Sequence, residues 1–284
     1  MSVQRSHALP ESKLSAQEFN EIRVLIQKIT GISMNDSKSQ LISRRLGGRL
    51  AELGIDNFRD YINYLESGNE SELEIFSNAV TTNLTSFFRE RHHFDYLEEH
   101  ILPEIETQKM ASQKRLRIWS AGCSTGEEPY SIAMMLRESM PKLSEWDAKI
   151  LATDLDTSVL ATCKKGQYSD QVLQKVPPEQ RKRWFREVGS TGQKKTEIHS
   201  KLKELITFKQ LNLMGAWPMQ GEFDVIFCRN VIIYFDKPTQ RKLIDRYANL
   251  LVDGGFLIIG HSESLLNVTN RFSLIGKTIY RKNG

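Results

Sequence analysis

The stretch from Leu116 to Tyr130, LRIWSAGCSTGEEPY, most constrains what this chain can fold into. A short apolar strand pattern stops at a turn of small residues, and a helical pattern follows. At such a junction, backbone N–H groups can approach a ligand closely. The acidic pair Glu127 and Glu128 would repel a polyanion there, whereas it suits a ligand with hydroxyls, an amine or a positive centre. The stretch therefore predicts a ligand site other than a bare phosphate site.

From Arg115 onwards, predicted strands alternate with predicted helices. Strands are expected at 115–119, 148–153, 206–213, 223–230 and 254–260, and a final hairpin at 271–282. Helices are expected at 127–140, 157–165 and 237–251. This order is typical of an α/β fold, a mostly parallel sheet with helices on both faces. Ligands of such sheets bind at the carboxyl ends of the strands, where the unusual residues fall: loop 120–128, Asp154, Asn212 and Arg229-Asn230.

The N-terminal part predicts four short amphipathic helices with short connections, which favour a small all-α domain. Capping boxes at Ser15–Glu18 and Ser71–Glu74 are expected to begin the first and fourth helices. The second helix is expected from about Asp36 to Leu53, and Asp56 is expected to cap the third. Residues 1–14 are polar and are expected to fray. A further helix is expected from His92 to Ile105.

We divide the chain into an N-terminal helical domain, residues 1–86, and an α/β domain, residues 87–284. Residues 167–205 interrupt the alternation and include the turn Gly189-Ser-Thr-Gly192. They form either a decorated crossover connection or a small β-insert, at about 180–207, whose edge strand could take up a partner.

Three basic residues, Lys38, Arg45 and Arg49, lie along one edge of the second helix, with Arg44 further round. A solvated basic edge is one interpretation. A docking surface for an acidic partner is the other.

Charge and cysteine content limit the class of protein. Lys and Arg exceed Asp and Glu only by 39 to 35, less than in most DNA-binding domains. Three cysteines without a CxxC pair suit a reducing compartment. Adjacent His92 and His93 do not share a helix face, so we expect no metal site there. With no apolar leader and no membrane-length stretch, we expect a cytoplasmic protein that does not insert into membranes.

Absent motifs narrow the ligand further. A strict GxGxxG is missing, which disfavours NAD, and neither GxxxxGK[ST] nor GxSxG occurs, which disfavours P-loop NTPases and α/β-hydrolases. Asp154 ends the second strand, where α/β nucleotide folds place a ribose-binding carboxylate. An adenosine-type ligand without a triphosphate remains, and the acidic strand end together with a C-terminal hairpin points to S-adenosylmethionine.

Five motifs resemble the CheR family of chemotaxis receptor methyltransferases: TTNLTSFFRE, WSAGCSTGEEPYSIA, ATDLD, FCRNVIIYF and GHSESL. The resemblance covers almost the whole chain. It implies a class I (Rossmann-like) S-adenosylmethionine methyltransferase sheet with a C-terminal antiparallel hairpin. It also implies methyl transfer from S-adenosyl-L-methionine to glutamate side chains of methyl-accepting receptors, which gives γ-methyl esters for sensory adaptation and S-adenosyl-L-homocysteine as the other product.

The resemblance implies roles for single residues. Arg89 and Tyr234 are expected to face the reaction as catalytic residues. The expected cofactor-binding residues are Asn83, Thr85, Arg89, Glu128, Asp154, Asn212, Leu213, Arg229 and Asn230, with Asp154 on the ribose. Expected partners are cytoplasmic helices of membrane chemotaxis receptors, docked along Lys38, Arg45 and Arg49. Some family members also bind a receptor C-terminal peptide through the β-insert. We expect a monomer that needs no metal.

The implied reaction requires little acid–base catalysis from the protein. A glutamate carboxylate, with a pKa near ~4.3, is already ionised at pH 7, so no general base is needed. Catalysis is then mainly alignment, with Arg89 orienting the carboxylate and Tyr234 positioning it by a hydrogen bond.

Two alternatives stay open. A nucleic-acid methyltransferase is favoured by the basic isoelectric point and the basic second helix. Amino methylation of bases, however, goes with a Pro-Pro-aromatic motif where this chain has Asn230-Val-Ile-Ile-Tyr234. A non-catalytic cofactor-binding receptor adaptor would be indicated by loss of Arg89 or Tyr234, and both are present.

Overall fold

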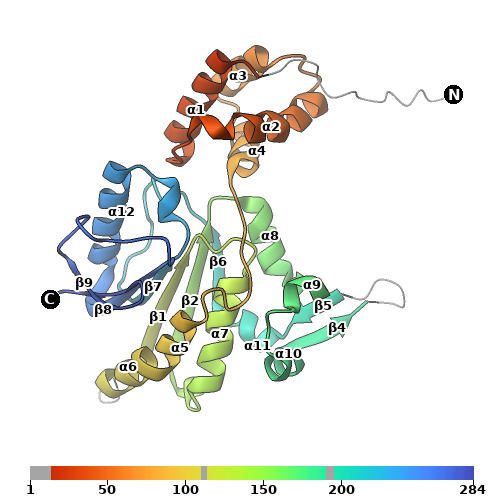
Figure 1. Ribbon diagram of the computed structural model, residues 1–284. Helices are drawn as coiled ribbons and strands as arrows, with labels where there is room; N and C mark the ends of the chain where they lie inside the picture. Colours follow the sequence, from red (N-terminus) through yellow and green to blue (C-terminus); the bar gives the residue numbers. More distant parts are fainter. Residues whose placement is uncertain (1–13, 110–113, 190–194) are drawn as a thin grey trace. The chain divides into compact units, whose positions relative to one another are not determined.

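The computed structural model describes residues 14–109, 114–189 and 195–284 (Figure 1). The chain forms two compact units that meet between Thr82 and Asn83, a few residues before the predicted boundary at 86/87. The expected fraying of residues 1–13 and the predicted turn at 190–192 lie outside the described residues. None of the described helices is both long and apolar enough to cross a membrane.

The first unit is helical, as predicted. Its described elements are α1 (Ala16–Thr30), the 3-10 turn η1 (Asp36–Lys38), α2 (Ser39–Leu53), α3 (Phe58–Glu66) and α4 (Glu70–Val80). The capping box of α1 is confirmed, because Ser15 and Glu18 each accept a hydrogen bond from the other's backbone N–H. Gly31 ends this helix at φ +77°, a left-handed conformation that favours glycine.

Two predicted caps are wrong by one or two residues. Asn57, not Asp56, caps α3 by accepting a hydrogen bond from the Asp60 backbone N–H. Asn69, not Ser71, caps α4, and the Ser71 hydroxyl donates to the Asn69 side chain at 2.7 Å. Asn, Asp and Ser cap helices almost equally well, so the sequence alone does not choose between close neighbours.

The second unit contains a seven-stranded sheet in the order β6-β2-β1-β7-β8-β10-β9. The strands are β1 (Arg115–Ala121), β2 (Asp147–Asp154), β6 (Ile206–Gln210), β7 (Phe223–Cys228), β8 (Leu251–Ile259), β9 (Phe272–Gly276) and β10 (Ile279–Lys282). Strands β6, β2, β1, β7 and β8 pair in parallel, whereas β10 is antiparallel to β8 and β9. The predicted α/β sheet with a C-terminal hairpin is thereby confirmed.

Helices flank this sheet, with α7 and α12 on opposite faces (Figure 1). The described helical elements outside the β-insert are α5 (His92–Tyr96), the π-helical turn η2 (Leu97–Ile101), α6 (Leu102–Lys109), α7 (Glu127–Ser139), η3 (Leu143–Glu145), α8 (Thr157–Lys165), η4 (Ile232–Tyr234) and α12 (Lys237–Leu250). The helix predicted from His92 to Ile105 is therefore interrupted by a π-helical turn.

The interruption after α8 is a small β-insert rather than a plain crossover. Its elements are β3 (Gln167–Tyr168), α9 (Asp170–Leu173), α10 (Pro178–Trp184), β4 (Phe185–Val188), β5 (Lys195–Ile198) and α11 (Ser200–Lys203). The three strands form a separate sheet in the order β3-β5-β4, so β4 is an edge strand of this sheet.

The candidate functional site lies at the carboxyl ends of the parallel strands. Strand β1 lies between β2 and β7, so the strand order switches direction there, as in ligand-binding α/β sheets. Two strands are shorter than predicted: β6 ends at Gln210 instead of residue 213, and β7 ends at Cys228 instead of residue 230. Asn230 has φ +59°, which a strand cannot accommodate, and its turn carries the chain away from the sheet.

Candidate functional site

The loop after β1 is a tight turn fixed to the end of β2. The backbone N–H groups of Gly122 and Cys123 both donate to the Thr153 carbonyl, at 2.8 and 2.9 Å. Gly122 has φ +83°, and a Cβ atom there would lie 2.4 Å from Cγ2 of Val231. Only glycine fits this position without strain, because the loop after β7 packs directly against it.

Asp154 lies at the end of β2 and holds two loops. Its carboxylate accepts hydrogen bonds from the backbone N–H groups of Ser124 at 2.8 Å and Asp156 at 3.0 Å. Burial raises the pKa of Asp154, against the effect of these N–H donors. Asn83 joins the same cluster, because its side chain donates to Asp156 at 2.7 Å and its carbonyl accepts from the Ser124 hydroxyl at 2.9 Å.

The segment before α5 bends sharply and presents Arg89. Phe88 and Glu90 both have left-handed backbone, with φ +50° and +56°. The bend is held by the buried ring of Phe87, which packs against the β-insert, and by the Phe88 N–H, which donates to the Ser131 hydroxyl at 3.0 Å. Arg89 stays partly exposed and donates to the Leu84 carbonyl at 2.8 Å. Thr85 also stays partly exposed.

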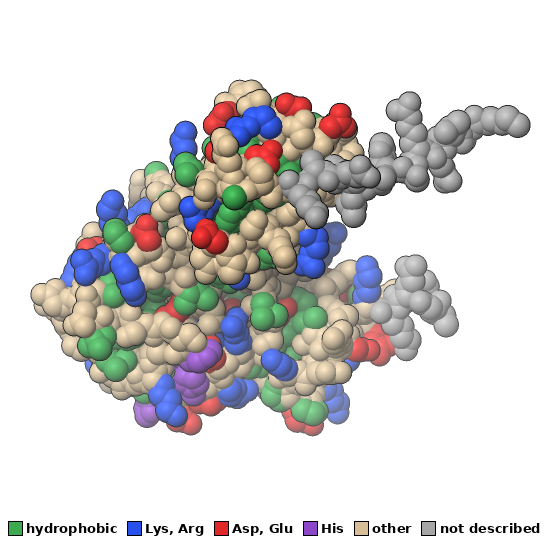
Figure 2. All heavy atoms as spheres, turned by 45° about the horizontal axis from the view of Figure 1, so that its top comes forward, with side chains coloured by type: hydrophobic (Ala, Val, Ile, Leu, Met, Phe, Trp, Pro, Cys, Tyr) green, Lys and Arg blue, Asp and Glu red, His purple; other side chains and the backbone are tan. Residues whose placement is uncertain are grey.

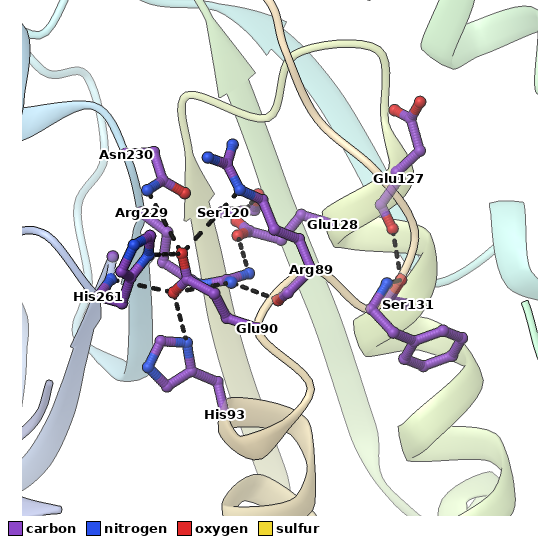
Figure 3. A network of polar contacts seen from close by, with 12 residues as sticks. Arg89, Glu90, His93, Ser120, Glu127, Glu128, Ser131, Arg229, Asn230 and His261 are labelled. Atoms are coloured by element: carbon purple, nitrogen blue, oxygen red, sulfur yellow. Dashed lines mark hydrogen bonds and ion pairs between the residues drawn. The ribbon is translucent and has the colours of Figure 1, made fainter. Parts of the chain in front are cut away.

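A buried guanidinium joins this bend to the start of α7 (Figure 3). Arg229 donates to Glu128 at 3.0 Å and to the backbone carbonyl of Arg89, and its Nη2 lies 3.3 Å from Glu90. Glu128 also accepts from the Ser120 hydroxyl at 2.7 Å. Burial raises the pKa of Glu128, and the charge of Arg229 opposes that rise.

Glu90 is the other acid of this network. Its carboxylate accepts hydrogen bonds from the backbone N–H of His261 at 3.1 Å and from the side chain of Asn230 at 3.4 Å, and it lies 2.7 Å from Nδ1 of His261. Burial alone would raise the pKa of Glu90, but the hydrogen bond from His261 and the charge of Arg229 lower it to about 2. Glu90 therefore stays ionised at neutral pH.

Glu263 fixes the turn that leads to Tyr234. This carboxylate accepts backbone N–H groups from Gly260 at 2.6 Å, Asn230 at 2.9 Å and Ile233 at 3.1 Å. Burial raises the pKa of Glu263, and these donors oppose the rise. Tyr234 follows in η4 with a partly exposed side chain.

Sequence reasoning did not assign roles to Glu90, His261 or Glu263. The signal was present, because Glu90 ends the motif TTNLTSFFRE and the other two lie in GHSESL. Of the predicted residues, the structure joins Arg89, Glu128, Arg229 and Asn230 in one network and Asn83 with Asp154 in a second cluster.

Asn212 and Leu213 lie in a separate turn after β6. The Asn212 side chain accepts from the Met214 N–H at 2.9 Å, and the Leu213 carbonyl accepts from Arg246 at 2.6 Å. The Arg246 guanidinium also lies 3.7 Å above the ring of Trp217. The turn is thereby held in a fixed conformation.

The three predicted docking residues, Lys38 in η1 and Arg45 and Arg49 in α2, differ in what they contact. Lys38 is exposed. Arg45 donates to the carbonyls of Thr81 at 2.6 Å and Ala79 at 3.3 Å, so no carboxylate offsets its charge in these contacts.

Arg49 forms its ion pairs within the helical unit. It forms ion pairs with Glu72 at 2.6 Å and Glu52 at 2.8 Å. Glu72 is buried and also accepts a hydrogen bond from the Tyr61 hydroxyl at 2.8 Å.

The site suits a cationic, hydroxyl-bearing nucleoside. The buried Oδ1 of Asn230 and the buried Nε of Arg229 have no hydrogen-bond partner among the described residues, so polar groups of a ligand could satisfy them. Glu127 and Glu128, both buried at the start of α7, disfavour a phosphate. Among the described residues, no group of three or more His, Cys, Asp and Glu side chains could hold a metal ion.

Comparison with known proteins gives matches along nearly the whole chain. The family model for the CheR methyltransferase SAM binding domain matches residues 83–281, and that for the CheR methyltransferase all-alpha domain matches residues 17–81. A probable chemotaxis protein methyltransferase of Rhizobium etli is 46% identical, over 90% of this chain and 96% of that protein. Chemotaxis protein methyltransferase 2 of Pseudomonas aeruginosa is 40% identical over 95% and 94%. The chemotaxis protein methyltransferase of Escherichia coli is 39% identical over 94% and 91%.

Proposed function

Because this chain belongs to the CheR methyltransferase family, we propose that it methylates glutamate side chains of chemotaxis receptors, with S-adenosyl-L-methionine as the methyl donor. The products are glutamate γ-methyl esters and S-adenosyl-L-homocysteine. The observation that carries the proposal is the network at the carboxyl ends of the parallel strands, where Arg229 joins the backbone of Arg89 to the buried acid Glu128.

The cofactor is held by residues from several segments. Asp154 binds the ribose hydroxyls, Glu128 attracts the cationic part, and Arg229-Asn230 and Asn212-Leu213 close around the adenosine. Asn83 and Thr85 line the site from the segment before Arg89. When bound, S-adenosylmethionine supplies a methyl group on a positively charged sulfur.

The protein's contribution to the reaction is mainly geometric. Arg89 orients the ionised substrate carboxylate, and the Tyr234 hydroxyl positions it by a hydrogen bond. Holding two reactants in line can contribute about 7 to 11 kcal/mol of barrier reduction. The guanidinium of Arg89 already donates a hydrogen bond to the Leu84 carbonyl. Fewer of its N–H groups can therefore bind the substrate carboxylate, which keeps that carboxylate nucleophilic.

A radiolabel experiment tests this function. The protein is incubated with S-adenosylmethionine labelled in its methyl group, together with receptor cytoplasmic fragment or nucleic acid. Base-labile label on the receptor supports the proposal, whereas label on nucleic acid favours the first alternative. Cofactor binding without transfer favours the receptor adaptor.

Asp154→Asn is expected to abolish cofactor binding.

Receptor helices dock along η1 and α2 through Lys38 and Arg45, whereas Arg49, the third predicted docking residue, contributes least because Glu72 and Glu52 already neutralise it. Substrate glutamates lie on acidic helices, which a row of cations attracts. Lys38→Glu is the cleanest test, since this side chain is exposed, whereas reversing Arg49 would also leave buried Glu72 unpaired. We expect a KM for receptor about 3- to 10-fold higher with unchanged S-adenosylhomocysteine affinity. Exposed Lys28 on α1 provides the matched control, Lys28→Glu.

A receptor C-terminal peptide adds as a strand to edge strand β4 of the β-insert (Figure 1). Glu187→Pro removes a backbone N–H that points away from β5, because the register that pairs Trp184 with His199 turns the N–H groups of Arg186 and Val188 toward β5. If strand addition occurs, the variant binds the peptide more weakly while the radiolabel assay on the receptor fragment lacking the peptide is unaffected.

We also propose that the monomer is the active form, which light scattering checks. On the face seen in Figure 2, basic and acidic side chains are interspersed over the described part of the chain. Nucleic-acid binding domains, in contrast, gather their cations into a patch or stripe.

A further inference from the structure

Glu90 is the most densely bonded acid of the network, yet no role follows for it from the proposed function. Its carboxylate contacts residues from the ends of two strands: Arg229 and Asn230 after β7, and His261 after β8. Its own backbone is held at φ +56°. Figure 3 shows the Glu90 carboxylate at the centre of these contacts.

The charges around Glu90 are paired closely. Arg229 lies between the carboxylates of Glu128 and Glu90, at 3.0 and 3.3 Å. Arg89 adds a second cation, with its Nε 4.0 Å from Glu90. These four groups carry two positive and two negative charges, and without Glu90 they would carry a net charge of +1.

His93, which lies beside Glu90, does not change this balance of charges. The side chain of His93 is fully buried, and burial together with the nearby Arg229 lowers the pKa of His93 to about 3. It is therefore neutral at pH 7. Glu90, in contrast, keeps its negative charge there, since its pKa is about 2.

We propose that Glu90 is a positioning residue that neutralises Arg229 and Arg89 and thereby sets the affinity of the site for the sulfonium cofactor relative to its uncharged-sulfur product. The inference rests on the proposed function, because it requires the cofactor to bind at this network. S-Adenosylmethionine and S-adenosylhomocysteine share their adenosine and amino-acid groups but differ by one positive charge at sulfur. A site with a net positive charge disfavours the first molecule more than the second.

The test is calorimetric titration of both molecules into the wild type and Glu90→Gln. Glutamine keeps the size of the side chain but not its charge. At an effective dielectric of about 20 to 40, a unit charge at a distance of about 10 Å changes affinity by about 4- to 16-fold. We expect the ratio of the dissociation constants, S-adenosylmethionine over S-adenosylhomocysteine, to rise by this factor. If Glu90 had a purely structural role, Glu90→Gln would weaken the binding of both ligands equally. The ratio would then stay unchanged, which would overturn the proposal.

Three further variants separate charge from hydrogen bonding. Glu90→Asp keeps the charge, and His261→Ala removes the side chain whose Nδ1 contacts Glu90 without removing a negative charge, so neither should raise the ratio. Asp95→Asn breaks an ion pair with Arg91 in the same segment, at 2.8 Å, and serves as the matched control. A raised ratio in any of the three contradicts the charge argument.

If Glu90→Gln does not fold, Arg89→Gln gives the complementary measurement. This side chain is partly exposed, and removing its charge leaves the network with a net charge of −1. The ratio should then fall, and an unchanged ratio overturns the proposal. If the wild type binds neither molecule, the proposed function itself is refuted. If the wild type binds both and Glu90→Gln has the same ratio of dissociation constants, only the role of Glu90 is refuted.

Discussion

His93 provides a quantitative link between pH and the stability of the second unit. Its ring is fully buried, with Nε2 2.9 Å from the Thr278 hydroxyl and 3.1 Å from the Lys277 carbonyl at the β9–β10 turn. Burial, with the charge of Arg229, lowers the pKa of His93 from an ordinary value of 6.5 to about 3. Because the folded-state pKa is below the unfolded-state pKa, the unfolded chain takes up the proton first as pH falls.

The free energy of unfolding should therefore fall between pH 6.5 and about 3. One extra proton bound by the unfolded state gives a slope of up to about 1.4 kcal/mol per pH unit. Between pH 7 and pH 5 this amounts to about 2 kcal/mol. In His93→Gln, which keeps an N–H donor but cannot titrate, this part of the pH dependence should be absent.

Urea titrations at pH 7, 6 and 5, followed by tryptophan fluorescence, measure this difference. The four tryptophans, residues 119, 146, 184 and 217, all lie in the second unit. Buried acids such as Glu128 and Asp154, whose pKa values are raised, act in the opposite sense, but they are present in both proteins and cancel in the comparison. Exposed His100 gives the control His100→Gln, which should behave as the wild type. Equal pH slopes in the wild type and His93→Gln would refute the reasoning.

Three other outcomes follow from the site and the helical unit. Arg89→Ala should lower the rate of methyl transfer by about 100-fold or more while the urea midpoint stays unchanged, and wild-type transfer would exclude a catalytic role. Gly122→Ala should lower stability by about 1 to 3 kcal/mol and weaken S-adenosylhomocysteine binding, because its Cβ would meet Val231, and calorimetry with urea titration measures both. Glu72→Gln should destabilise the helical unit by about 1 to 3 kcal/mol, because Arg49 loses its buried ionic partner but keeps Glu52, and unchanged amide hydrogen exchange in α2 to α4 would contradict this.

Periodicity predicted the order of elements because strands and helices differ in the spacing of their apolar residues. The ends of elements were harder to predict. The capping box at Ser15 is confirmed, but neighbouring cap-forming residues misplaced the starts of α3 and α4. Only the hydrogen bonds that each backbone N–H finds decide between such neighbours.

The network around Glu90 could not be predicted from local pattern. Glu90, Glu128, Arg229 and His261 are far apart in sequence, and the parallel sheet brings them together at the ends of its strands. In the same way, the spacing of Arg49 placed it correctly on an edge of α2, but its commitment to Glu72 depends on how α2 packs against α4.

The left-handed backbone of Phe88, Glu90, Ser124 and Asn230 has a consequence for protein engineering. Each such residue costs roughly 1 to 3 kcal/mol relative to relaxed backbone, and glycine would relieve that cost. A selection for thermostability alone should therefore enrich glycine at these positions, whereas a selection for methyl transfer should retain the native side chains. Substitutions that raise the melting temperature but lower turnover would thus mark, without any bound ligand, the segments that this chain keeps strained for catalysis.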